Sequence, residues 1–273
     1  MALIPLLASG ADGVKDSCFD CHNVMEGTSA IFKDDVHYHN TISCVDCHGG
    51  DPKDDTANLS MSPDRGFKLR VTRQGTPDFC AHCHSDAAYM GKFNPQLRVD
   101  QLALYSTGVH GKQLAAGRKG AAECVDCHSI HNIRAGSDPL SPASPQHVTD
   151  TCAKCHAAAA ELFRKSPHAR FTSQRRPGCV ACHASHATQP AGPAMLAGGT
   201  STCARCHNAT SAGGKAAAQI AEYLAGLEAA GPGSSAALAR ARLAVHSFDL
   251  AAIKRAAETP APASDAAPKT PTP

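Results

Sequence analysis

The clearest helical spacing of hydrophobic positions lies near the C-terminal end of this 273-residue chain. Across the Ala-rich residues 213–230, apolar side chains recur three and four positions apart, at Ile220, Leu224 and Leu227, which is the period of one helix face. Residues 231–233 (Gly-Pro-Gly) end that helix, and Ser234 or Ser235 can cap a second one. Because the apolar positions then resume and lead up to His246, we predict an α-helical hairpin.

Elsewhere the pattern predicts short helices joined by irregular segments, with little β-structure. Residues 157–164 have the composition of one such helix. Residues 49–79 are rich in Asp, Pro, Gly and Ser, which is typical of a surface loop. No apolar run approaches the roughly 18 residues of a membrane-spanning helix, which argues against an integral membrane protein.

Large apolar side chains are too few for a conventional core. The chain has no Trp, only 4 Tyr and 8 Phe, and much of its 42% hydrophobic content is Ala and Cys. Such a chain would not offset its conformational entropy unless something else filled the interior. The 26 Lys and Arg against 24 Asp and Glu lack the basic excess of a nucleic-acid binder, so we expect no nucleic-acid partner.

All 14 cysteines belong to C-x-x-C-H motifs, the attachment signature of c-type haem. The two thiols of a motif form thioethers with the haem vinyl groups, and the adjacent imidazole binds the iron as proximal ligand. The seven cysteine pairs are Cys18 and Cys21, Cys44 and Cys47, Cys80 and Cys83, Cys124 and Cys127, Cys152 and Cys155, Cys179 and Cys182, and Cys203 and Cys206. The proximal histidines are His22, His48, His84, His128, His156, His183 and His207.

Zinc sites and disulfides explain this pattern less well. Structural zinc sites combine two C-x-x-C pairs or add a distant His, whereas seven pairs cannot be matched two by two. A disulfide framework does not require a His after every second Cys. Seven covalent haems would also supply the missing buried surface, since porphyrins are large and apolar on both faces. We therefore expect seven haem c groups and a polypeptide that wraps around them.

The sixth iron ligand decides between electron transfer and catalysis, because an open position allows small molecules to bind. Nine histidines remain after the proximal seven, a close match to the number of sites. His131 and His186 each lie three residues after a proximal His, too close to reach the far face of their own haem but well placed for a neighbouring one. The predicted distal ligands are His37, His110, His131, His147, His168, His186 and His246.

Two histidines remain as alternates. His39 lies two residues from His37 and could replace it, or bind a haem across a subunit boundary. His82 lies inside its own motif, where the local turn points it away from its iron. We interpret it as a surface residue or as a ligand to an adjacent haem.

With these motifs and histidines, the chain resembles the multihaem c-type cytochromes of the bis-histidine kind, related to the cytochrome c3-like and doubled C-x-x-C-H families. The resemblance covers roughly residues 15 to 250. It rests on the seven motifs and on short sequence segments between or after them, such as Val109-His110-Gly111 and Val245-His246-Ser247-Phe248-Asp249. It implies electron transfer along closely spaced haems, in the periplasm or outside the cell.

We divide the chain into four parts. Residues 1–11 look like the remnant of a signal segment or a flexible N-terminus, although a charged n-region is missing. Residues 12–210 form the predicted heptahaem domain, residues 211–258 the C-terminal helical segment, and residues 259–273 a disordered tail rich in Pro, Ala and Thr.

The main hypothesis is an exported electron carrier, not an enzyme, that passes electrons between redox partner proteins. The partners would include a membrane quinol-oxidising complex or other multihaem cytochromes. One alternative is a subunit of an extracellular haem filament. Another is a multihaem reductase of a small substrate such as nitrite or hydroxylamine, which requires an iron with an open axial site.

Overall fold

The computed structural model describes residues 17–24, 28–170 and 177–259, and its contacts group the chain into two compact units, residues 1–147 and 148–273. All regular structure in the described part is helical, with no strand, which confirms the predicted fold class. The predicted signal remnant (1–11) and the residues of the predicted tail from 260 on lie outside the described residues.

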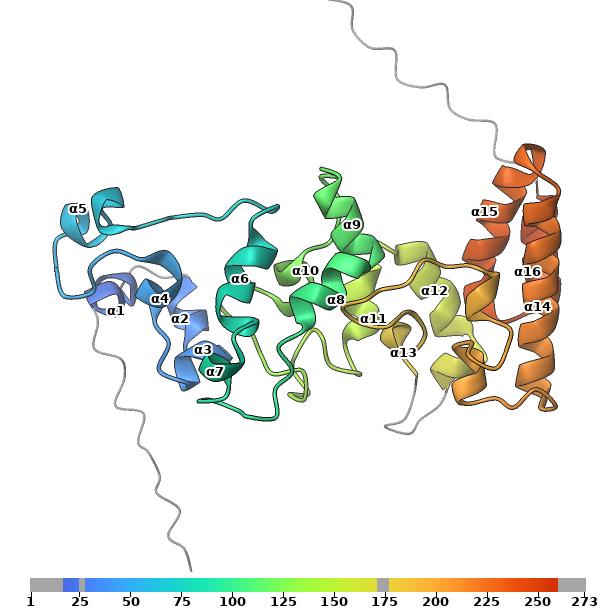
Figure 1. The fold of residues 1–273 in the computed structure, drawn as a ribbon, viewed down its shortest axis with the longest axis horizontal. Helices are drawn as coiled ribbons and strands as arrows, with labels where there is room; N and C mark the ends of the chain where they lie inside the picture. Colours follow the sequence, from blue (N-terminus) through green and yellow to red (C-terminus); the bar gives the residue numbers. More distant parts are fainter. Residues whose placement is uncertain (1–16, 25–27, 171–176, 260–273) are drawn as a thin grey trace, which may run out of the picture. The chain divides into compact units, whose positions relative to one another are not determined.

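The first unit consists of short helices joined by irregular segments (Figure 1). They are α1 (Ser17–His22), α2 (Thr28–Phe32), α3 (Val36–His39), α4 (Cys44–His48), α5 (Ala57–Ser60), the 3-10 turn η1 (Pro63–Arg65), α6 (Thr76–His84), α7 (Ala87–Met90), α8 (Gln101–Thr107), α9 (Val109–Ala115) and α10 (Cys124–His128).

The second unit holds longer helices and several 3-10 turns. They are α11 (Val148–Ala153), α12 (Ala157–Lys165), η2 (Pro167–Arg170), α13 (Cys179–His183), η3 (Pro193–Met195), η4 (Cys203–Arg205), α14 (Ala212–Ala229), η5 (Pro232–Ser234), α15 (Ser235–Ala244), η6 (Val245–Ser247) and α16 (Leu250–Glu258).

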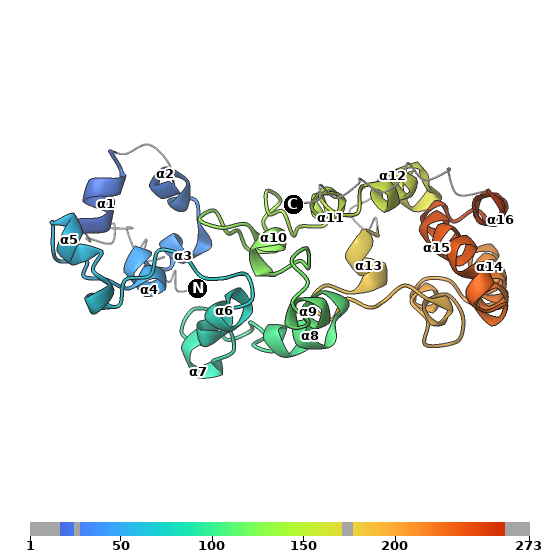
Figure 2. The same cartoon turned by 90° about the horizontal axis from the view of Figure 1, so that it is seen from above.

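The predicted C-terminal hairpin has a third helix. α14 ends at Ala229 and α15 begins at Ser235, as the Gly-Pro-Gly segment predicts. The chain then turns at η6 and forms α16, because the Asp249 carboxylate accepts hydrogen bonds from the backbone N–H groups of Ala251 and Ala252 and caps a new helix. Figure 2 shows α14, α15 and α16 side by side.

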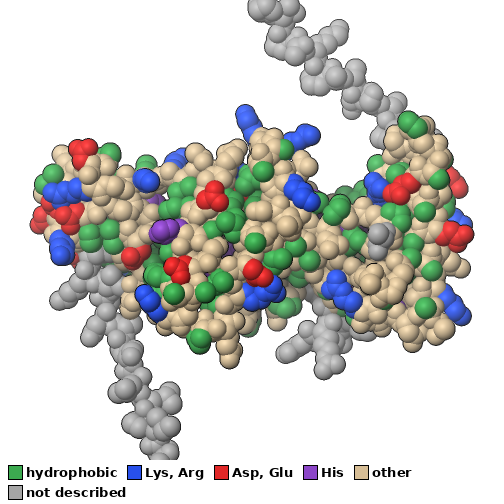
Figure 3. All heavy atoms as spheres, viewed as in Figure 1, with side chains coloured by type: hydrophobic (Ala, Val, Ile, Leu, Met, Phe, Trp, Pro, Cys, Tyr) green, Lys and Arg blue, Asp and Glu red, His purple; other side chains and the backbone are tan. Residues whose placement is uncertain are grey.

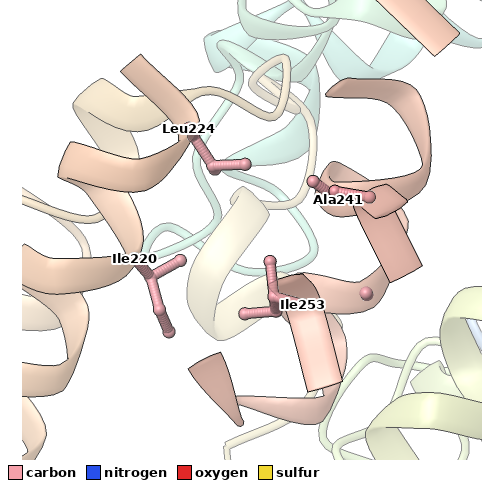
Figure 4. Packing of buried hydrophobic residues seen from close by; sticks show 6 residues of the cluster. Ile220, Leu224, Ala241 and Ile253 are labelled. Carbon is pink, nitrogen blue, oxygen red and sulfur yellow. The ribbon is translucent and has the colours of Figure 1, made fainter. Parts of the chain in front are cut away.

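These three helices enclose the main hydrophobic cluster of the second unit (Figure 4). Ile220 and Leu224 come from α14, Ala241 from α15 and Ile253 from α16. Leu224 is 1% exposed, and Ala241 and Ile253 are fully buried. Burial of such side chains contributes roughly 1.5–3 kcal/mol each, so this helical segment has a small core made of side chains alone.

The first unit contains a smaller aromatic cluster. The rings of Phe19 and Phe32 stack with centroids 6.1 Å apart, and Tyr38 meets both edge-on at 5.5 and 5.9 Å. Offset and edge-to-face pairs at such separations are favourable beyond the area they bury. The cluster ties α1, α2 and α3 together beside the first two C-x-x-C-H motifs.

The predicted loop after the second motif folds back on the motif itself. The backbone N–H of Lys68 donates to the His48 carbonyl at 2.7 Å, and Gly50 N–H donates to the Arg65 carbonyl. Gly49 and Gly50 have φ of 67° and 90°, and a Cβ on Gly49 would come within 2.9 Å of the Gly66 carbonyl carbon. Only glycine tolerates both the conformation and this close approach.

The surface carries both charge signs. In the view of Figure 3, Lys and Arg side chains are interspersed with Asp and Glu rather than gathered by sign. Within the described residues, the structure contains no helix with the length and apolar character needed to span a membrane.

Candidate functional site

Five of the seven C-x-x-C-H motifs lie within α-helices, in α1, α4, α6, α10 and α13, and in two of them an intervening residue helps to cap the helix. In the two C-V-D-C-H motifs, the helices α4 and α10 begin at the first Cys and end at the His. The Asp46 carboxylate accepts from the Ser43 backbone N–H at 2.7 Å, and the Asp126 carboxylate accepts from the Glu123 N–H at 2.9 Å. These reciprocal capping interactions hold two thiols and an imidazole on one helical turn.

Three motifs end in the same unusual backbone conformation. The residue after the proximal His has φ of 67° at Gly49, 73° at Ser129 and 61° at Ala184, each with ψ near 180°. This region strongly favours glycine, and other residues adopt it at a cost of about 1–3 kcal/mol. The conformation is therefore strained at Ser129 and Ala184, whereas Gly49 adopts it freely.

The imidazole rings of four predicted distal histidines each lie close to the ring of a proximal histidine that is distant in the sequence. In the first unit, the ring centroids of His37 and His84 are 5.8 Å apart and those of His131 and His48 are 6.0 Å apart. In the second unit, His168 lies 6.0 Å from His207 and His246 lies 6.0 Å from His183.

These separations fit a haem iron between the two rings. A metal–imidazole nitrogen bond is about 2.0–2.1 Å long, and adding two such bonds to the distance from each nitrogen to its ring centre gives roughly 6 Å. The pairs join residues far apart in the sequence, such as His48 and His131, so local geometry does not cause them. Four pairs of the same spacing are therefore suited to holding an iron from both faces.

Burial favours the neutral, metal-binding form at one imidazole of each pair. It lowers the pKa of one ring in each pair, and the facing imidazole lowers the pKa further, at His84, His131, His168 and His183. A neutral imidazole has a lone pair available for an iron.

The other predicted iron ligands lie within the short helices or in the turns beside them. His22 ends α1, His128 ends α10 and His156 precedes α12 as its N-cap residue. His110 lies in α9 and is partly buried, and His186 follows α13 and is partly buried. His147 is exposed, and its backbone N–H donates to the Ser144 carbonyl. Of the alternates, His39 ends α3, where it is exposed with its ring against Tyr38, and His82 is exposed within α6.

Cysteines of different motifs also come together. The side chains of Cys80 and Cys124 lie within interaction distance of each other in the first unit, and those of Cys152 and Cys179 do so in the second. If each sulfur is tied to the edge of a porphyrin, neighbouring sulfurs bring two porphyrin edges close together. Adjacent thiols therefore favour close haem–haem spacing within each unit.

Sequence reasoning did not single out the buried carboxylate of Asp35. Asp35 is fully buried, and its Oδ1 accepts from the backbone N–H of His37 at 2.9 Å and lies 2.8 Å from His37 Nδ1. Its Oδ2 accepts from the Ile133 N–H at 2.6 Å. Burial by itself would raise the pKa of Asp35, but these three hydrogen bonds, led by that from His37, lower the pKa below its ordinary value. The only sequence signal is an Asp two residues before a candidate ligand.

The outer nitrogens of the paired histidines meet different partners. His48 Nδ1 lies 2.8 Å from the Lys68 carbonyl, and His246 Nδ1 lies 2.9 Å from the Leu243 carbonyl. His168 Nδ1 is buried without a hydrogen-bond partner among the described residues. Because such partners set the basicity of a ligating imidazole, the four pairs would differ electronically as iron ligands although their ring spacings are similar.

Comparison with known families points in the same direction as the motifs. Residues 36–156 match the family model described as cytochrome c3, and residues 168–212 match the model described as the doubled CXXCH motif. No curated protein and no solved structure matches the chain. The two matched segments contain six of the seven C-x-x-C-H motifs and most of the predicted distal histidines.

Proposed function

We propose that this chain, which is a multihaem c-type cytochrome of the electron-transfer kind, carries seven covalent haems with histidine on both faces of each iron. Bound haem supplies reversible one-electron chemistry at the iron, and electrons tunnel between closely spaced porphyrins. The single observation that carries the proposal is the set of four cross-motif histidine pairs, 5.8–6.0 Å apart. A bis-histidine iron has no open position for a substrate, which favours an electron carrier over a reductase.

The residues of the chain would perform three tasks. The cysteine pairs anchor the groups covalently, and the proximal and distal histidines set the iron potentials. The neighbouring sulfur atoms of Cys80 with Cys124 and of Cys152 with Cys179 keep successive groups close. No acid, base or nucleophile is required. The partners would be redox proteins, including a membrane quinol-oxidising complex or other multihaem cytochromes, and the protein would act in the periplasm or outside the cell.

Mass and spectroscopy of the mature protein test this function. Intact mass should exceed the polypeptide mass by seven haems, the oxidised protein should be low-spin throughout, and the reduced protein should not bind carbon monoxide. A mass gain of fewer than seven haems would contradict the haem count. A high-spin fraction of about one haem in seven would instead support the reductase alternative.

A matched pair of variants tests the ligand assignment. His246→Ala removes a ring that lies 6.0 Å from His183, so one haem should become high-spin and bind carbon monoxide. His82→Ala removes an exposed ring within α6 and should leave the spectrum unchanged. Size-exclusion chromatography and electron microscopy of the unaltered protein distinguish a discrete carrier from a filament subunit.

A further inference from the structure

We propose that Asp35 is a positioning residue that lowers the reduction potential of the haem attached at Cys80 and Cys83. The inference rests on the proposed function, because it requires His84 and His37 to hold that haem iron. It adds a specific determinant of the potential at one site of the chain.

The contacts of Asp35 make it a permanent negative partner of His37. Its Oδ1 lies 2.8 Å from His37 Nδ1, which leaves Nε2 as the nitrogen available to the iron. All three of its hydrogen bonds come from N–H groups, two of them in the backbone, and a carboxylate accepts such bonds without donating any. The geometry therefore requires His37 to donate its Nδ1 proton to a carboxylate.

This arrangement strengthens His37 as an electron donor to the iron. A carboxylate that accepts from the outer nitrogen of a ligating His fixes its tautomer and raises its basicity. A more basic ligand stabilises ferric over ferrous iron, so the potential falls. The interaction is weakly screened because Asp35 is fully buried, and charges interact more strongly in the protein interior than in water.

Two other distal candidates have a different environment at the outer nitrogen. The outer nitrogen of His246 faces the Leu243 carbonyl, a neutral acceptor. That of His168 has no hydrogen-bond partner among the described residues. With other influences equal, the reduction potential should therefore be lowest at the His37 site, intermediate at the His246 site and highest at the His168 site.

Asp35 also connects two neighbouring sites. Its Oδ2 accepts from the Ile133 N–H, two residues after His131, and the Val36 N–H donates to the Ile133 carbonyl at 2.7 Å. The same carboxylate thus holds the segments that carry both distal histidines of the first unit described above. Because Cys80 neighbours Cys124, the lowered potential would shift the electron equilibrium toward the haem attached at Cys124 and Cys127.

Redox titration of the full haem-loaded chain tests the proposal, with Asp35→Asn against the matched control Asp34→Asn. Both substitutions remove one negative charge, but Asp34 is exposed and pairs with Arg134 at 3.3 Å. In Asp35→Asn, we expect the equilibrium constant for reducing one haem to rise about tenfold. For a one-electron couple, this corresponds to a reduction potential about 59 mV higher. One low-spin species in the ferric electron paramagnetic resonance spectrum should change as well, and Asp34→Asn should alter neither readout.

Three results would overturn the inference about Asp35. The first is superimposable titrations of Asp35→Asn and Asp34→Asn, and the second is a shift spread evenly over all haems. If Asp35→Asn loses haem, Asp35→Ser, which retains a capping hydroxyl, should give the same potential shift. The third is haem loss in both Asp35 variants but not in Asp34→Asn, which would make the role of Asp35 purely structural.

Failure of the proposed function is a separate result. An unaltered protein with too few haems or with a high-spin fraction would contradict the ligation scheme itself. An unaltered protein with seven low-spin haems and potentials insensitive to Asp35→Asn would contradict the inference alone.

Discussion

Substitution of Gly213 by Ala should displace the proximal histidine of the last motif. Gly213 is the second residue of α14, and a Cβ there would lie 2.6 Å from Cε1 and 2.8 Å from Cγ of His207, with Nδ1 closer still. Two non-bonded carbon atoms are in favourable van der Waals contact at about 3.5 Å or more. The ring or the helix must therefore move by roughly 1 Å.

The ring has little freedom to move if its motif is tied to a haem. His207 directly follows Cys206, so a covalent thioether anchors the backbone beside it. A shift of roughly 1 Å is half of a metal–nitrogen bond of about 2.0 Å, enough to weaken or break ligation. Overpacking of this kind costs about 1–3 kcal/mol, against a helix-propensity gain of about 1 kcal/mol for Gly→Ala.

Gly226→Ala is the matched control, because it makes the same change in the same helix. Gly226 lies in the interior of α14, and a Cβ there meets nothing within 4 Å. It should therefore stabilise the protein by about 0.5–1 kcal/mol. Gly213→Ala should instead lower the thermal midpoint and give one high-spin haem that binds carbon monoxide when reduced.

Absorption spectra with and without carbon monoxide, and thermal unfolding followed by circular dichroism, separate the two outcomes. Equal gains in midpoint for both variants, with fully low-spin spectra, would refute the steric argument. That result would mean that α14 moves away from His207 without cost.

Three further predictions concern stability. Ile253→Ala should destabilise the C-terminal helices by about 2–5 kcal/mol in denaturant unfolding, because Ile253 is fully buried in the cluster, whereas Leu243→Ala, at a residue 40% exposed, should change stability far less. Ala184→Gly should raise the unfolding midpoint by relieving the φ of 61° after the sixth motif, a strain of about 1–3 kcal/mol; an unchanged or lower midpoint would argue against strain. Burial raises the pKa of Tyr105, whose hydroxyl donates to the Ala122 carbonyl, from 10 to about 12. Because the folded state keeps this proton longer, its stabilisation is complete below pH 10 and is lost as the pH rises through 12, and in Tyr105→Phe the unfolding free energy should lose that dependence.

The sequence by itself determined the chemistry of this protein. The spacing of each motif, such as Cys44-Val45-Asp46-Cys47-His48, is a local property, because two thiols and an imidazole must meet one haem within a single helical turn. The helix that contains Ile220 and Leu224 followed from local periodicity in the same way. The predicted hairpin does not include the third helix, α16, because the contribution of that helix depends on Ile253 packing against the other two helices.

Only the tertiary structure decided which histidines meet. His131 faces His48 across 83 positions of sequence, and His246 faces His183 across 63. The chain path that joins them passes through residues with positive φ, Ser129, His131 and Ala184, whose conformations are unfavourable in isolation and are held by surrounding contacts. Asp35 shows the same limit, since a buried carboxylate between His37 and Ile133 depends on contacts between segments about 100 residues apart, which local sequence patterns do not encode.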